Sequence, residues 1–165
     1  MSYLKLVNGV MVSRTPEEIE AEELANFPER KQMKIKEITA ERDRRVYTPI
    51  AAVDIKGDNS VMVEPDIRND TDKANLLALS LHATQLKAAG ETGAVIPFGA
   101  ADNLQHMLTP AEMIAVAAAP FPRASALYVR ARQLKDAANA ATDNAALDLI
   151  DIETGSIDGD GGWPE

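Results

Sequence analysis

The same helix-start signal occurs twice in this sequence, at residues 15–18 (TPEE) and at residues 109–112 (TPAE). In each, a threonine can cap a helix with its hydroxyl group, a proline takes the first helical position, and a glutamate lies three residues after the threonine. Each signal follows two short apolar segments separated by turn-forming residues, which is typical of a β-hairpin. The pattern predicts an α+β fold: a mainly helical domain with short β-hairpins, preceded by a small N-terminal module of one hairpin and one helix.

The amino-acid composition supports an aliphatic, helical core. Hydrophobic residues make up 45% of the chain but aromatic residues only 4%, and alanine supplies much of the apolar share. The chain has no cysteine, which excludes disulfides, thiolate metal sites and thiol nucleophiles.

The charge distribution disfavours two classes of partner. The formal net charge is −9, and residues 143–165 carry seven acidic side chains and no basic one. Such a segment repels nucleic-acid phosphates and anionic lipids, and no segment approaches the ~20 apolar residues of a transmembrane helix. We therefore expect no nucleic-acid partner and no membrane partner, and a chain that is made and folded in the cytoplasm.

Turn and helix signals predict the order of the elements. The first hairpin should surround Asn8-Gly9, and the helix that follows should end at Phe27-Pro28. Further expected elements are a helix at residues 29–45, hairpins within 46–63 and 94–108, and helices at 70–89, 110–119, 123–141 and 144–150. The expected domains are residues 1–28 as a docking module, 29–152 as the main helical domain and 153–165 as a flexible acidic tail.

Two helices carry apolar stripes at helical spacing. We expect the helix at 70–89 to place four leucines in the core: Leu76, Leu79, Leu81 and Leu86. The stripe of the helix at 123–141 has smaller residues: Leu127, Ala131, Leu134 and Ala138. Small residues allow a close approach of another helix, from within the chain or from a second subunit, and we expect a homo-oligomer interface there.

No residue pattern points to catalysis, and we expect no catalytic residue, cofactor or metal site. His82 lies on the polar side of its helix, and His106 lies in a predicted strand without a neighbouring Ser, Asp or Glu pattern. The acidic run at residues 158–161 (DGDG) ends too close to the C-terminus for a calcium loop. A cleft converging on His106, Glu112 and Arg130 would favour the alternative, a small enzyme.

Basic residues replace aliphatic ones at the end of the helix at 29–45. Continuing the spacing of Ile35 and Ile38 leads to Arg42 and Arg45, which could bind the carboxylates of a partner. The alternative is structural, because basic residues near a helix C-terminus stabilise the helix dipole.

Several segments resemble a phage protein family encoded beside tail-fibre and tail-fibre assembly genes. They are residues 38–45 (ITAERDRR), 68–83 (RND…NLLALSLHA), 101–117 (ADNLQHMLTPAEMIAVA), 127–137 (LYVRARQLKDA) and 147–155 (LDLIDIETG), followed by Gly162-Trp163-Pro164. Residues 1–28 resemble the short modules that begin phage tail-fibre-associated proteins.

The resemblance implies a structural or assembly protein without catalytic activity, located in the virion tail. Its implied partner is a tail-fibre or baseplate protein, and the alternative is a cytosolic assembly chaperone that is not retained in the virion. We expect the partner to be contacted by Tyr3, Leu4, Leu6, Arg42, Arg45 and Trp163.

Overall fold

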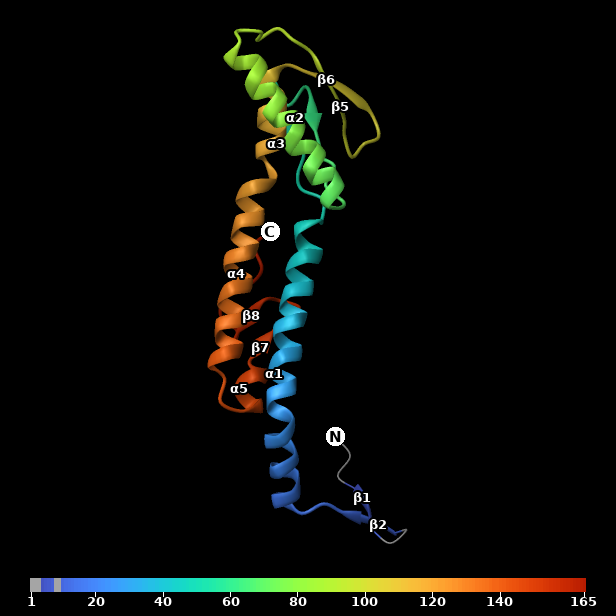
Figure 1. Ribbon diagram of the computed structural model, residues 1–165, viewed down its shortest axis with the longest axis vertical. Helices are drawn as coiled ribbons and strands as arrows, with labels where there is room; N and C mark the ends of the chain where they lie inside the picture. The colour runs from blue at the N-terminus through green and yellow to red at the C-terminus, as the bar shows by residue number, and fades with distance from the viewer. Residues whose placement is uncertain (1–3, 8–9) are drawn as a thin grey trace. The chain divides into compact units, whose positions relative to one another are not determined.

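The computed structural model describes residues 4–7 and 10–165 (Figure 1). The chain divides into two compact units. The terminal unit comprises Met1–Arg42 and Val129–Pro164, of which residues 1–3 and 8–9 are not described. The central unit comprises Asp43–Tyr128 together with Glu165.

Both units combine helices with short antiparallel strand pairs. The terminal unit contains β1 (Leu4–Val7), β2 (Val10–Ser13), most of α1 (Pro16–Val46), the second half of α4 (Pro120–Ala140), α5 (Asn144–Asp148), β7 (Ile150–Asp151) and β8 (Ser156–Ile157). The central unit contains β3 (Val53–Asp54), β4 (Met62–Val63), α2 (Asp70–Ala88), β5 (Ile96–Gly99), β6 (Gln105–Leu108) and α3 (Pro110–Ala118). Within the described residues, the strands form four two-stranded sheets, β1-β2, β3-β4, β5-β6 and β7-β8. The predicted α+β, mainly helical fold is confirmed.

Both predicted helix starts are confirmed as capping boxes. The backbone N–H of Thr15 donates to Glu18 Oε2 at 3.1 Å, and the N–H of Glu18 donates to Thr15 Oγ1 at 3.3 Å. At α3 the N–H of Thr109 donates to Glu112 Oε2 at 2.7 Å, and the N–H of Glu112 donates to Thr109 Oγ1 at 3.4 Å. Two backbone donors of each helix end are thus satisfied by local side chains.

The expected end of a helix at Phe27-Pro28 is wrong, because α1 continues through Pro28. Proline removes one backbone donor, which leaves the carbonyl of Leu24 without its helical hydrogen bond. Leu24 is 73% exposed, so water can bond to that carbonyl. Strong helix formers on both sides, including several glutamates and lysines, favour continuation.

The second half of the chain differs from expectation in two helix boundaries. The break before α4 lies at Ala119, and α4 starts at Pro120 rather than after Pro122. Both prolines therefore lie in the first turn, where a missing N–H costs little. The predicted last helix ends earlier than expected, at Asp148.

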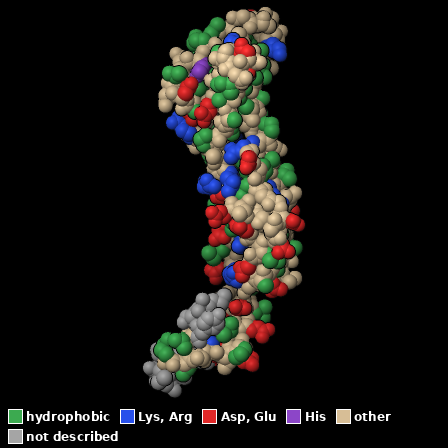
Figure 2. Space-filling model, turned by 180° about the vertical axis from the view of Figure 1, so that it is seen from behind, with side chains coloured by type: hydrophobic (Ala, Val, Ile, Leu, Met, Phe, Trp, Pro, Cys, Tyr) green, Lys and Arg blue, Asp and Glu red, His purple; other side chains and the backbone are tan. Residues whose placement is uncertain are grey.

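Charged side chains of both signs are mixed on one face of the molecule. On the face drawn in Figure 2, Lys and Arg side chains lie among Asp and Glu side chains, and no broad basic area is visible. Among the described residues, no helix is long and apolar enough to cross a membrane.

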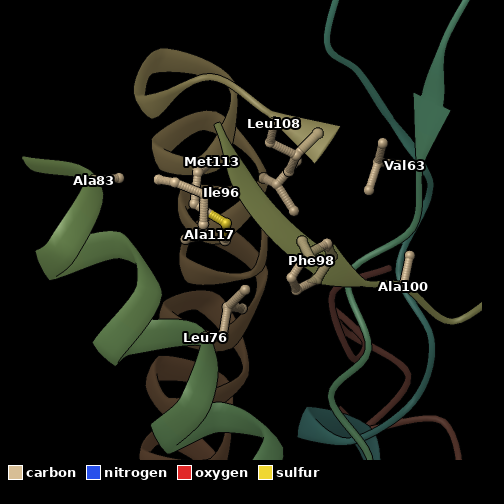
Figure 3. Close-up of a cluster of buried hydrophobic side chains, with 10 residues drawn as sticks. Val63, Leu76, Ala83, Ile96, Phe98, Ala100, Leu108, Met113 and Ala117 are labelled. Carbon is tan, nitrogen blue, oxygen red and sulfur yellow. The ribbon is translucent and has the colours of Figure 1, made fainter. Parts of the chain in front are cut away.

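The core of the central unit lies between α2, α3 and the β5-β6 hairpin (Figure 3). It consists of Val63, Leu76, Ala83, Ile96, Phe98, Ala100, Leu108, Met113, Val116 and Ala117. Leu76 is buried as predicted, and Leu79 and Leu86 pack partly against this core. The prediction for Leu81 is wrong, because Leu81 is 61% exposed. It lies about 140° around the helix from Leu76, beyond the face that α3 covers.

The expected flexible tail is folded. Its backbone returns through the β7-β8 pair, and the ring of Trp163 is buried. The Trp163 Nε1–H donates to Ile152 O at 2.8 Å, and the backbone N–H donates to Thr154 O at 2.9 Å. Gly155 has φ +76° and an added Cβ there would lie 2.6 Å from the Trp163 ring, so glycine is required at this close approach.

The α3 capping box predicts a measurable pH dependence. Hydrogen bonds from the Lys56 ammonium (2.5 Å) and the Thr109 N–H lower the pKa of Glu112. A lowered folded-state pKa stabilises the protein above the unfolded-state value, and this contribution is lost as the pH falls through the folded-state pKa. Glu112→Gln can still complete the capping box but removes the charge and the ion pair with Lys56, so it should cost about 0.5–1 kcal/mol near pH 7. In urea denaturation the difference from wild type should shrink towards pH 3, whereas a constant difference would contradict the assignment.

Candidate interaction site

Basic residues on one side of α1 hold the end of α4, α5 and β7 in place. The Lys31 ammonium donates to the carbonyls of Asn139 (3.0 Å) and Ala141 (2.8 Å), at the C-terminal end of α4. The Lys34 ammonium donates to Ile150 O at 3.1 Å, and Arg30 pairs with Asp148 at 2.6 Å. Cations at a helix C-terminus satisfy carbonyls that have no helical partner. These charges are structural and do not form a ligand site.

The expected oligomer interface on α4 is wrong. Leu127, Ala131, Leu134 and Ala138 are all 2% exposed or less within the single chain. In the terminal unit α1 runs beside the second half of α4 (Figure 1), and Lys31 of α1 donates to carbonyls at the end of α4. The apolar stripe was correctly recognised, but its partner belongs to the same chain.

The expected partner contact at Trp163 is also wrong, because its side chain is enclosed by its own chain. Arg130 supports the same segment: its Nε donates to Gly155 O at 2.7 Å and its Nη2 to Asp160 O at 2.7 Å. Gly161 has φ +75°, and a Cβ added there would meet the Arg130 guanidinium at 2.6 Å. Arg130 and Trp163 together fold the C-terminal segment.

The two arginines at the end of α1 are half-buried. Arg42 and Arg45 both interact with other groups in the structure. Their positions in the last turns of a long helix suit the favourable interaction with the helix dipole. A role for them in partner binding stays a prediction.

The N-terminal hairpin presents apolar side chains to solvent. Leu4 is 45% exposed and Met11 is 56% exposed. Leu6 pairs with Met11 in the strand register, its side chain is not described, and Tyr3 lies outside the described residues. Within the described residues, the extensive contacts of β1 and β2 are with each other. A two-stranded hairpin is marginal in water without a surface to pack on.

A second exposed apolar surface lies on α2. We call it the α2 outer stripe, and it consists of Ala74, Leu77, Leu81, Thr84 and Ala88, all of which are exposed. The opposite side of the same helix carries the buried residues Leu76 and Ala83. α2 is therefore apolar on two sides, and only one is covered in the described structure.

An open cleft of about 400 Å³ lies between α2 and β5. Its lining includes Asp66, Asp72, Leu79 and Phe98. Both carboxylates are paired with Arg68, at 2.6 Å and 3.6 Å. The cleft therefore combines apolar side chains with two carboxylates that share one guanidinium, and these three groups carry a net charge of −1.

His106 has an acidic neighbour that the sequence argument missed. The hairpin turn brings Asp102, four residues earlier, to 2.9 Å between its Oδ2 and His106 Nε2. Asp102 Oδ1 also accepts the N–H of Leu104 at 2.8 Å, and these two contacts lower the pKa of Asp102. A search for paired residues across the predicted turn could have found the pair. Its contacts close the β5-β6 turn.

Each of the three residues named for an enzyme site has a local structural role. His106 closes a turn, Glu112 caps α3 and Arg130 holds the C-terminal segment. None of the three lines the cleft between α2 and β5. In the described part of the chain, no group of three or more His, Cys, Asp or Glu side chains is placed to hold a metal ion. His82 is exposed, as expected.

Residues 29–154 match the family model described as "Domain of unknown function (DUF4376)". The protein belongs to the DUF4376 family. The DUF4376 match begins inside α1 and leaves the β1-β2 hairpin and the first turns of that helix outside. It includes residues 43–128 of the central unit, with the α2 outer stripe and the β5-β6 hairpin. No curated protein and no solved structure matches the chain.

Proposed function

We propose that this protein is a non-catalytic phage tail component that binds a tail-fibre or baseplate protein through its N-terminal hairpin. The observation that carries the proposal is the β1-β2 hairpin itself. Its apolar residues Leu4 and Met11 are exposed, and a hairpin of this size requires a surface to pack on. A partner can supply that surface, either by covering the apolar side chains or by adding a strand to an open edge.

The position of the hairpin relative to the family match supports a docking role. The DUF4376 match begins at residue 29, so the hairpin is an addition to the family domain in this chain. The resemblance to proteins encoded beside tail-fibre genes provides the tail context. A virion component made in the host cytoplasm is the form we favour.

The local roles of the titratable residues support a binding protein. His106 is used to close a turn and Glu112 to cap a helix, and Arg130 donates to two backbone carbonyls. These residues are engaged in holding the fold.

Deleting residues 1–13 tests the docking role directly. The deletion removes the hairpin but keeps the capping box at Thr15 and all of α1. It should leave a cooperatively melting protein that no longer binds its tail-fibre or baseplate partner in a pull-down with the purified proteins. A less drastic variant, Leu4→Asp combined with Met11→Asp, should weaken binding in the same way.

Leu24→Asp is the matched control, because Leu24 is exposed on α1 outside the hairpin. It should bind like wild type. Undiminished binding after the deletion would overturn the docking role, and loss of the thermal transition would show that the hairpin completes the core. Mass spectrometry of purified particles separates a retained virion component from a released chaperone.

A further inference from the structure

Residues of the α2 outer stripe are placed symmetrically along the helix, so the stripe can pair with the same stripe of a second copy. Leu77 and Leu81 lie two residues on either side of Leu79, and Ala74 and Thr84 lie five residues on either side. In an antiparallel pair of helices, residues at equal distances on either side of one centre face each other. Leu77 of one copy would therefore contact Leu81 of the other, and the reverse contact would form by symmetry. Such self-complementarity is what a twofold interface requires.

The exposure of the two leucines shows that the stripe is available in the single chain. Leu77 is 47% exposed and Leu81 is 61% exposed. The residues beside them near the centre, Ala78 and Ser80, are small, so they allow two helix backbones to approach closely. Burial of two leucines from each copy provides a hydrophobic contribution to association.

The charges at the ends of α2 select the antiparallel orientation. Asp70 lies at the start of the helix in line with the stripe, and Lys87 lies in its last turn. An antiparallel pair places Asp70 of one copy near Lys87 of the other at both ends, whereas a parallel pair places Asp70 beside Asp70. The Tyr47 hydroxyl donates to Asp70 Oδ1 at 2.6 Å. The other oxygen of the Asp70 carboxylate can accept a hydrogen bond from the Lys87 ammonium of the second copy.

Lys73 is a further cation near this contact. Lys73 is on the same side of α2 as Lys87. Its ammonium lies 5.7 Å from the centroid of the Tyr47 ring in its own chain, an attractive contact between a cation and an aromatic face. This contact directs Lys73 towards Tyr47.

We propose that two copies of this chain associate through the α2 outer stripe as an antiparallel, twofold-symmetric pair. The pair replaces the interface that the sequence suggested on α4. It does not depend on the tail role, because both helices belong to copies of the same chain.

Sedimentation of the full chain at micromolar concentration tests the pair. Wild type should have twice the monomer mass of 17.8 kDa. Leu81→Glu should raise the dissociation constant by about 30-fold or more, the effect of losing a central contact. Leu104→Glu is the matched control, because Leu104 is 62% exposed in the same unit but lies outside the stripe. A monomeric wild type, a trimer, or a dimer that persists in Leu81→Glu would each overturn the proposal.

Charge reversal tests the orientation. Asp70→Lys and Lys87→Asp should each weaken the dimer, because each places like charges at both ends. The double variant restores opposite charges and should recover most of the affinity. Circular dichroism checks that each variant keeps its helix content. Failure of the double variant to recover, with both single variants folded, would contradict the antiparallel pairing.

Cross-linking gives an independent measure of orientation, since the chain has no cysteine. A cysteine at Ala78, near the proposed twofold axis, should be joined to its copy by a short bis-maleimide reagent. A cysteine at Gln85 should not, because antiparallel helices would separate the two copies of that position by about 20 Å along the axis. Equal cross-linking at both positions would indicate a parallel pair and overturn the proposal.

Discussion

Replacing Trp163 by alanine should lower the free energy of unfolding of the terminal unit by about 3–5 kcal/mol. The ring is only 8% exposed and packs at Gly155, while its Nε1–H donates to Ile152 O. Its removal leaves a cavity and a carbonyl without its donor. Urea and thermal denaturation followed by circular dichroism measure the loss.

Trp163→Phe is the control for this experiment. It keeps an aromatic ring at the site but removes the hydrogen bond, so its cost should be smaller, about 1–3 kcal/mol. Trp163 is the single tryptophan of the chain, and its fluorescence in wild type should be blue-shifted and poorly quenched by iodide. Full quenching of the fluorescence by iodide, or an alanine variant as stable as wild type, would contradict the burial of Trp163. Either result would support the original prediction that Trp163 is exposed and contacts a partner.

Leu134→Ala should destabilise the terminal unit by about 2–5 kcal/mol without changing the oligomeric mass of the folded protein. Leu134 is fully buried in α4, so truncation creates an internal cavity rather than a defect between subunits. Denaturation measures the first quantity and sedimentation the second.

Val129→Ala controls for effects on the helix itself, because Val129 lies on α4 and is 57% exposed. It should change the stability by about 0.5 kcal/mol or less. A Leu134→Ala variant with unchanged stability but weakened self-association would show that the α4 stripe is an interface after all.

Two apolar stripes show where sequence reasoning reaches its limit. The stripes containing Leu134 on α4 and Leu81 on α2 have similar spacing, and both were recognised. The sequence predicts an interface role for Leu134 and a core position for Leu81, whereas the structure buries Leu134 and exposes Leu81. Periodicity identifies an apolar face, but it does not say which surface covers it.

The C-terminal segment shows the same limit for a different reason. Its Gly and Asp content is typical of a flexible tail, yet its order depends on contacts with a residue distant in sequence. Arg130 reaches the carbonyls of Gly155 and Asp160, 25 and 30 residues away. No local pattern contains that information.

The candidate docking site could be predicted only in part. The hairpin around residues 3–12 was predicted from turn chemistry, and its strands are confirmed at Leu4–Val7 and Val10–Ser13. The sequence did not reveal that α1 continues through Pro28. The Leu24 carbonyl, which loses its helical hydrogen bond there, belongs to an exposed residue that water can reach. The hairpin is therefore attached directly to a long helix.

The sequence alone determined the features that depend on neighbouring residues. The capping boxes at Thr15 and Thr109 and the β5-β6 hairpin form from groups within a few positions of one another, so their chemistry can be read locally. Only the tertiary structure decided which apolar faces are buried and whether the C-terminal segment folds. Those outcomes depend on the surface area and hydrogen bonds shared between distant segments, and the energy of such contacts exists only once the chain has brought the segments together.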